Sequence, residues 1–165
     1  MPNSLTNIVV AGLGGQGVLT ATNIFADAIL RAGFDVKTSE IKGMSQRGGS
    51  VMCDVRFGTK VLSPMIPPGE ADYLVILEPT QVEPFHYLLK PGGMLLTPDQ
   101  VDATRLPHRK SLNAALLGRL STALPISEDA WREALRAGFP AAIFETNRAA
   151  FLVGREAQAS LVPAP

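Results

Sequence analysis

The chain begins with a short β-branched run, a glycine-rich turn and a segment of helical periodicity. Residues 7–12 (NIVVAG) are apolar and end in glycine, and residues 18–33 place apolar side chains near helical spacing before Gly33, a natural C-cap. Residues 34–41 (FDVKTSEI) alternate as a second strand does. The pattern predicts a βαβ unit, with parallel strands and a right-handed crossover, of Rossmann-like type.

The next segment departs from the usual dinucleotide-binding plan. Residues 43–50 (GMSQRGGS) form a glycine-rich loop, and residues 51–57 (VMCDVRF) carry apolar side chains at every second position. A period of two is typical of a half-buried antiparallel strand. Gly58 and Thr59 predict a tight hairpin turn into a further strand over residues 60–66 (KVLSPMI). The sheet is therefore expected to be mixed.

The middle of the chain predicts two more strands. Residues 73–77 form a fully apolar strand, and Pro79 lies near the start of a helix that Pro84 shortens or kinks. Residues 90–98 (KPGGMLLTP) predict a turn and a strand, and the polar residues 98–110 predict a surface connection.

Helices alone are expected after that connection. Residues 111–124 keep apolar side chains in helical register until Pro125. Residues 126–140 form a second helix, with Ser127 as its N-cap and acidic residues at its positive end. Residues 141–158 form the last helix.

Length and composition indicate one domain. A chain of 165 residues, 46% of them hydrophobic, can bury one core but not two ordinary ones. We predict a single three-layer α/β domain, Rossmann-like with a mixed sheet, which begins with a βαβ unit and ends in helices. It is expected over residues 1–160, with a flexible tail over residues 161–165.

Charge and cysteine content limit the partners. Lys plus Arg and Asp plus Glu both total 15, so no broad field draws the chain to nucleic acid or to a membrane. The start of the chain lacks the pattern of a secretory signal, and no apolar run reaches the roughly 18 residues of a membrane span, so we expect a cytoplasmic protein. Cys53, the single cysteine, is expected to be a buried, inert thiol, and alone it cannot hold an iron–sulfur cluster.

The glycine-rich turn at residues 12–17 (GLGGQG) is the first candidate site. Gly12, Gly14 and Gly17 have the Gly-x-Gly-x-x-Gly spacing of dinucleotide-binding turns, whose backbone N–H groups suit a phosphate or carboxylate. The same glycines can also serve only to pack a helix closely on a strand. Glu40 lies near the place where such folds hold ribose hydroxyls, yet no residue set for hydride transfer accompanies it.

The second candidate is the loop that carries Arg47. Its guanidinium can pair with a carboxylate or phosphate, and Gly48 and Gly49 allow a ligand or another backbone to come close. A solvated turn arginine is the alternative. Function is favoured because both glycine loops leave the same end of the sheet, where open α/β folds bind ligands.

No catalytic or metal-binding set emerges elsewhere. His86 has no second ligand at metal-binding spacing, and residues 108–110 (HRK) are most simply a solvated basic patch. Trp131 is expected in the core or in an interface. Two glycine loops without a catalytic set are expected of a subunit that carries part of a composite site.

These motifs resemble a known family. The stretches NIVVAGLGGQGVLTATNIFADA, SEIKGMSQRGGSVMCDVRFGTKVLSPMIPPGEADYLVILEP and LKPGGMLL are similar to the gamma domain of the 2-oxoacid:acceptor oxidoreductases. NAALLG and FETNRAAFLVG follow the same pattern, and the pairing of GxGGQG with SQRGGSV is specific. SEIKGMSQRGG and VLSPMI look most like the indolepyruvate-type small (beta) subunit, or a relative acting on an aryl 2-oxoacid such as phenylglyoxylate.

The resemblance implies a heteromeric enzyme in which larger partner subunits hold thiamine diphosphate and iron–sulfur clusters. That complex converts a 2-oxoacid and coenzyme A to acyl-CoA and carbon dioxide and reduces ferredoxin or another acceptor. This chain binds no cofactor tightly and is expected to be inactive alone, although coenzyme A approaches this domain in some members. The stretch between MLLTP and NAALLG is shorter than in indolepyruvate-type subunits, where a further strand and helix are expected.

We expect the two loops to form one wall of a site shared with the partner, with a role in positioning. Because Leu13 is uncharged, any phosphate contact there would rest on backbone N–H groups and Gln16. A free-standing NAD-binding oxidoreductase and a nucleotide-free assembly module are the alternatives. The predicted site residues are Gly12, Gly14, Gly15, Gln16 and Gly17 in the first loop and Ser45, Arg47, Gly48 and Gly49 in the second.

Overall fold

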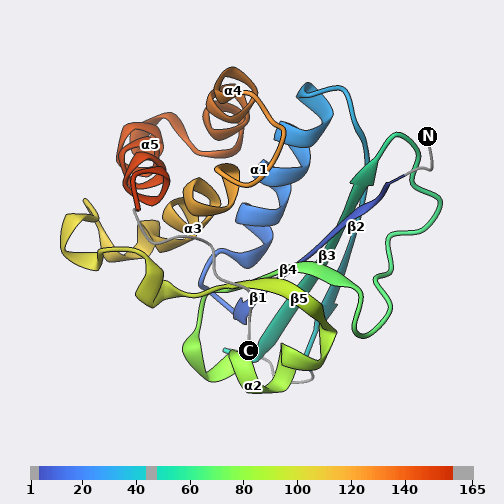
Figure 1. The fold of residues 1–165 in the computed structure, drawn as a ribbon. Helices are drawn as coiled ribbons and strands as arrows, with labels where there is room; N and C mark the ends of the chain where they lie inside the picture. Colours follow the sequence, from blue (N-terminus) through green and yellow to red (C-terminus); the bar gives the residue numbers. More distant parts are fainter. Residues whose placement is uncertain (1–3, 44–47, 158–165) are drawn as a thin grey trace.

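A five-stranded mixed sheet in the order β2-β3-β1-β4-β5 forms the centre of the protein (Figure 1). The computed structural model describes residues 4–43 and 48–157. The mixed α/β architecture predicted from the sequence is confirmed. The strands are β1 (Thr6–Leu13), β2 (Asp35–Lys42), β3 (Ser50–Gly58), β4 (Ala71–Ile76) and β5 (Leu89–Leu96).

The order of the strands separates the two halves of the predicted βαβ unit. Strands β1 and β2 are joined by helix α1 (Val18–Arg31) and point the same way, as predicted. They are not neighbours, because β3 lies between them and runs antiparallel to both. On the other side of β1, strands β4 and β5 continue the sheet in parallel.

Helices cover the two faces of the sheet unequally (Figure 1). One face carries α1 together with α3 (Leu112–Ser121), α4 (Glu128–Gly138) and α5 (Ala141–Arg155), which confirms the three C-terminal helices predicted from periodicity. Of the helices in the described part of the chain, the other face carries the short helix α2 (Val82–Phe85) with the 3₁₀ turns on either side of it. Among the residues described, no helix is long and apolar enough to cross a membrane.

The larger core lies between the sheet and the four helices. Trp131 is fully buried there, stacked on Phe25 with ring centroids 5.6 Å apart, so its predicted place in the core is confirmed. The alternation in β3 also holds, since its apolar side chains face this core. Ser127 caps α4 as predicted, because its Oγ accepts the N–H of Ala130 at 3.2 Å.

Helices α3 and α5 cross at glycines. A Cβ on Gly154 would lie 1.8 Å from the carbonyl oxygen of Ala115, and one on Gly118 would lie 1.9 Å from that of Phe151. Any side chain at either position would therefore force the two helices apart. Helical periodicity alone gave no indication of this close approach.

The prediction of a hairpin after Gly58 is wrong. Residues 59–70, here called the strap, contain no strand and connect β3 to β4 as an irregular segment. Ile66 of the strap donates its N–H to Oδ2 of the buried Asp54 at 3.1 Å, a side-chain contact in place of a strand ladder. Prolines cannot donate to a ladder, and the strap contains three, Pro64, Pro67 and Pro68.

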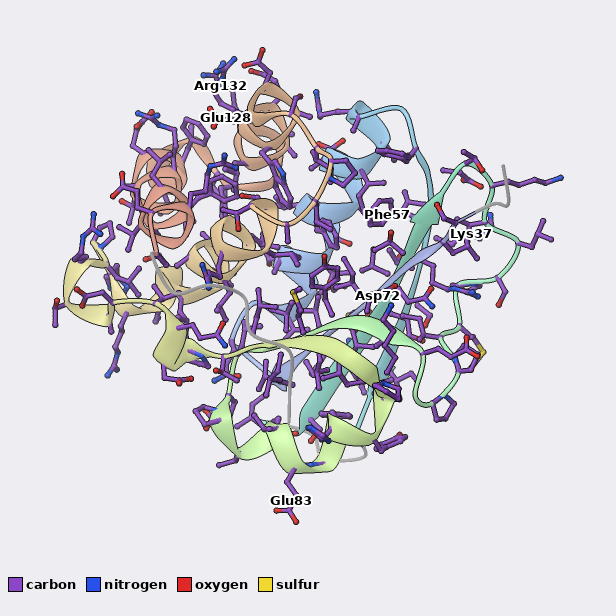
Figure 2. All side chains as sticks on the ribbon, in the orientation of Figure 1. Lys37, Phe57, Asp72, Glu83, Glu128 and Arg132 are labelled. Atoms are coloured by element: carbon purple, nitrogen blue, oxygen red, sulfur yellow. The ribbon has the colours of Figure 1, made fainter. Side chains whose placement is uncertain are left out.

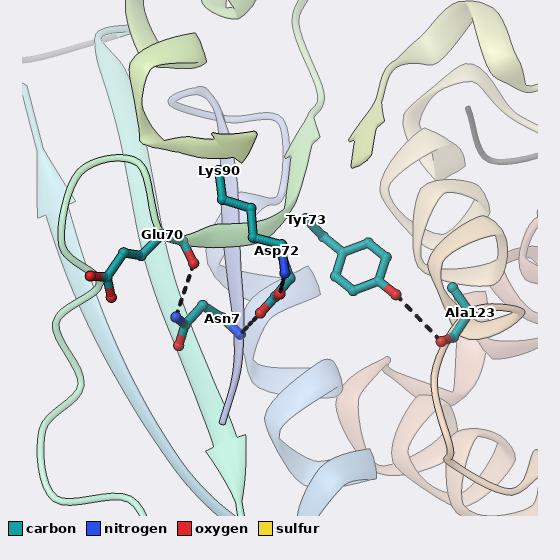
Figure 3. Close-up of polar contacts among 6 residues, drawn as sticks. All are labelled: Asn7, Glu70, Asp72, Tyr73, Lys90 and Ala123. Atoms are coloured by element: carbon teal, nitrogen blue, oxygen red, sulfur yellow. Dashed lines mark hydrogen bonds and ion pairs between the residues drawn. The ribbon is translucent and has the colours of Figure 1, made fainter. Parts of the chain in front are cut away.

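Polar contacts join the amino-terminal ends of the parallel strands (Figure 3). The N–H of Asn7 donates to Oδ2 of Asp72 at 2.7 Å, and its side-chain amide donates to the carbonyl oxygen of Glu70 at 3.0 Å. Lys90 forms an ion pair with Asp72. These polar groups are matched within the chain, so the opposite end of the sheet is the better candidate for a ligand site.

Candidate functional site

The first glycine loop connects β1 to α1 at the carboxyl end of the sheet. Gly17 is the N-cap residue of α1 and has φ 80°, in the left-handed region, with no side-chain cap. The conformation therefore requires glycine, and a Cβ at Gly17 would also lie 2.4 Å from Nδ2 of Asn113 and displace that side chain. The first turn of α1 holds no acidic residue, which leaves its positive end available to an anion.

The side chain of Gln16 is engaged within this loop. Its Oε1 accepts the N–H of Leu13 at 2.7 Å, and its Nε2 donates to Oε2 of Glu78 at 3.1 Å. A Cβ at Gly12 would lie 2.8 Å from the same Oε1, which explains why glycine precedes the turn. Gln16 therefore shapes the loop, and backbone N–H groups are left as its donors to a ligand.

The two glycine loops meet, as the sequence predicts. The N–H of Gly14 donates to the carbonyl oxygen of Gly49 at 2.9 Å, and the backbone of Gly48 lies beside Gly14 as well. The other two predicted residues of the second loop, Ser45 and Arg47, lie outside the described residues. Their place in the site stays a prediction.

A third segment, the connection from β4 to α2, links the loops, and the sequence reasoning missed it. Glu78 bonds Gln16 of the first loop, and Gln81 accepts the hydroxyl of Ser50 at 2.5 Å at the end of the second. Both residues follow a buried strand parallel to β1. Polar residues at the carboxyl end of such a strand were the signal that could have found them.

A hollow of about 490 Å³ opens between the two loops, α1 and the end of β2. This volume is within the range of small-molecule sites. Gly14, Gly15 and Thr20 line one side, and Glu40 and Lys42 line another. Glu40 pairs with Lys42 at 3.1 Å, which fits its interpretation as a strand-end residue better than a ribose-binding role.

A second hollow of about 560 Å³ adjoins the first at Thr20, which lines both. It lies among the start of α3, the end of α4 and the start of α5. Its polar residues include Lys110, Asn113 and Asn147. Together the two hollows make an elongated surface across the amino-terminal end of α1.

The remaining candidates offer no reactive group. Cys53 is fully buried, as predicted, and burial raises the pKa of its thiol, so the reactive thiolate is disfavoured. His86 is exposed. Within residues 4–43 and 48–157, no group of three or more His, Cys, Asp or Glu side chains is placed to hold a metal ion.

Comparison with known proteins places this geometry in a family. The profile of the pyruvate ferredoxin/flavodoxin oxidoreductases matches residues 7–157. The chain belongs to that family. It is 35% identical to the indolepyruvate oxidoreductase subunit IorB of Thermococcus kodakarensis over 191 aligned positions, which cover 92% of this chain and 95% of that relative. IorB of Methanothermobacter thermautotrophicus is 28% identical, with 90% and 95% covered.

Solved structures of family members share the fold. The gamma subunit of a keto/oxoacid ferredoxin oxidoreductase from Geobacter sulfurreducens has a TM-score of 0.77 at 24% identity, with 93% of this chain and 96% of that chain covered. A 2-oxoglutarate:ferredoxin oxidoreductase from Magnetococcus marinus, with 2-oxoglutarate, coenzyme A and succinyl-CoA bound, has a TM-score of 0.81 at 24% identity. The match covers 97% of this chain and 32% of that one.

These findings confirm the family resemblance and the expectation of an oxidoreductase subunit. The T. kodakarensis alignment spans more positions than this chain has residues, so that relative carries segments without a counterpart here. In this chain, the connection between β5 and α3 contains three 3₁₀ turns, at Pro98–Gln100, Ala103–Arg105 and Arg109–Ser111. It holds no additional strand or helix.

Proposed function

We propose that this chain is the small subunit of a cytoplasmic, heteromeric 2-oxoacid:acceptor oxidoreductase that acts on indolepyruvate or another aryl 2-oxoacid. The complex converts the 2-oxoacid and coenzyme A to acyl-CoA and carbon dioxide and releases a proton and two electrons, which reduce ferredoxin or another acceptor. The observation that carries this proposal is the similarity to an indolepyruvate oxidoreductase subunit over 95% of that relative's length.

Larger subunits hold the thiamine diphosphate and the iron–sulfur clusters in this proposal. A cluster takes about four thiolates, whereas this chain has one cysteine, and that one is buried. The chain therefore does not fit a cluster by itself. Its contribution is to shape one wall of a shared site and to position what binds there.

Coenzyme A is the ligand that we assign to this wall. The positive end of α1 faces the first hollow and suits a phosphate, and the adjoining second hollow extends the surface for a long ligand. A family member of known structure has coenzyme A bound. The NAD alternative is less well supported, because Glu40 is paired with Lys42 and no His or Tyr is among the described residues that line the hollow.

The decisive test is purification of the complex on a tagged copy of this chain. We expect a larger subunit with bound thiamine diphosphate and the visible absorption of iron–sulfur clusters. The complex should reduce a viologen dye with coenzyme A and indolepyruvate or phenylglyoxylate, and faster than with pyruvate. Tight NAD binding and turnover by the isolated chain would instead support the dehydrogenase.

A substitution in the second loop separates a positioning role from a nucleotide-free assembly module. Arg47→Ala should raise the KM for coenzyme A about ten- to hundredfold, the effect of losing a charged hydrogen bond, while the complex still assembles. Arg132→Ala, at the far side of the helical layer, is the matched control (Figure 2). If the Arg47 variant has an unchanged KM for coenzyme A, the remaining explanation is that this chain is a nucleotide-free assembly module.

A further inference from the structure

Strand β2 is an open edge of the sheet. It pairs only with β3, and among the described residues none pairs with its outer side. Five of its eight residues are exposed, and its register against β3 runs without a bulge. An edge of this kind presents a row of unpaired N–H and C=O groups, which natural proteins usually cover or distort.

Beside this edge the strap exposes two large apolar side chains. Leu62 is 82% exposed and Met65 is 62% exposed, whereas Val61 and Ile66 of the same strap are buried in the protein. The strap is thus anchored at two points and turns Leu62 and Met65 to solvent. Single exposed apolar residues are common, but two on one anchored segment favour a docking surface.

Hydrogen bonds from the sheet hold the strap in place. Nη1 of Arg56 donates to the carbonyl oxygens of Ser63 and Met65, at 3.2 and 2.8 Å. Oδ2 of Asp35, at the start of β2, accepts the N–H of Val61 at 2.7 Å. Because the backbone is held, little conformational entropy is lost when the exposed side chains enter a partner.

The strap, the β2 edge and the candidate site form one continuous flank. Asp35 ties the first residue of β2 to the strap, and Lys42, the last residue of β2, lines the hollow between the glycine loops. Ile41 lies between them and is 48% exposed. A partner that completes the hollow therefore meets the β2 edge and the strap next.

The edge is poorly suited to a second copy of this chain. Two copies of β2 related by a two-fold axis would pair antiparallel, with one residue opposite itself. If the two-fold axis passes through Thr38, Val36 lies opposite Glu40, and if it passes through Ser39, Ile41 lies opposite Lys37. Each of these registers sets an apolar side chain against a charged one. Centring on Lys37 or on Glu40 opposes like charges.

Only registers centred near the ends of β2 would match side chains. Centring on Ile41 sets Glu40 opposite Lys42, and centring on Val36 sets Asp35 opposite Lys37, but either register pairs just a few residues at one end of the strand. A heterologous strand is free of this symmetry constraint. It can place a carboxylate opposite Lys37 and an apolar residue opposite Ile41, which share one face of β2.

We infer that the larger subunit docks on this flank by adding a strand to β2 and enclosing Leu62 and Met65 in an apolar pocket. The inference rests on the proposed function, because that function supplies the larger subunit. Its strand carries an acidic and an apolar residue at the positions facing Lys37 and Ile41. Main-chain hydrogen bonds supply affinity, and the strap side chains supply specificity.

The test uses the larger subunit purified from the complex and variants of this chain. Leu62→Lys and Ile41→Lys should each weaken its affinity about ten- to hundredfold, since each removes one buried aliphatic side chain from the interface. Leu152→Lys on α5, 42% exposed and in the helical layer, is the matched control and should leave affinity unchanged. The outward-facing amides of β2, which have no strand partner among the described residues, should exchange quickly in the free chain and more slowly in the complex.

The possible outcomes separate this inference from the proposed function. If both variants bind as tightly as the original chain and the β2 amides exchange equally fast in an active complex, the docking inference is wrong and the function stands. If the variants weaken binding but the complex oxidises no 2-oxoacid, the function fails and the docking surface stands. If sedimentation shows that Ile41→Lys dissociates a homodimer and binding of the larger subunit is unaffected, the edge belongs to a second copy.

Discussion

Exchanging Gln16 and Glu78 tests how the first glycine loop is held. Gln16→Glu keeps an acceptor for the N–H of Leu13 but sets two carboxylates where an amide now donates to a carboxylate at 3.1 Å. At that distance and an effective dielectric of 20, the repulsion is about 5 kcal/mol. Both side chains are half-buried and can separate, so we expect a loss of about 1–3 kcal/mol in unfolding free energy.

The reciprocal variants complete a double-mutant cycle. Glu78→Gln should change stability by less than about 1 kcal/mol, because its amide oxygen still accepts from Gln16. The double variant Gln16→Glu/Glu78→Gln should recover most of the loss, since the new amide donates to the new carboxylate. Urea denaturation at pH 7 measures all four chains. If the double variant is as unstable as Gln16→Glu alone, the contact does not hold the loop, and this reasoning is refuted.

Three further changes test the fold around the site. Gly154→Ala should destabilise by about 3 kcal/mol, because its Cβ would lie 1.8 Å from the carbonyl oxygen of Ala115, and a stabilised variant would contradict the close crossing. Ser127→Ala should cost about 1 kcal/mol in urea denaturation through the lost cap, and Ser127→Asp, which can still cap, is its control. Burial raises the pKa of Asp54 above 3.8, so its contribution to stability is greatest below that pH and is lost as pH rises through the folded-state pKa. Asp54→Asn should therefore raise the Tm at pH 7 but not near pH 3, and an equal rise at both would refute the link to ionisation.

Much of the element pattern could be predicted from the sequence because it depends on local periodicity. The period of two in residues 51–57 correctly predicted an antiparallel strand with its apolar side chains on one face. The predicted hairpin is wrong because Pro64, Pro67 and Pro68, which follow Gly58, have no N–H to donate to a strand ladder. Asp54 lies on the opposite face of β3 from those apolar side chains. Its buried carboxylate accepts the N–H of Ile66 from the strap, a contact that the alternation alone did not indicate.

The candidate site was predictable in outline. Both glycine loops could be placed at one end of the sheet, because strands that point the same way end together. The contact between Gly14 and Gly49 agrees with that reasoning. The part played by Glu78 could not be anticipated in the same way, because it depends on which strand lies next to β1.

By itself, the sequence determined most of the helices and strands, which side chains each turns to the core, and where glycine must interrupt them. These properties follow from hydrogen-bond geometry and burial over a few residues. Only the tertiary structure decided that β3 separates β1 from β2, that the strap stays out of the sheet, and that Gln16 reaches Glu78. Such choices depend on contacts between segments far apart in the chain, and local periodicity does not encode which distant segment becomes the neighbour.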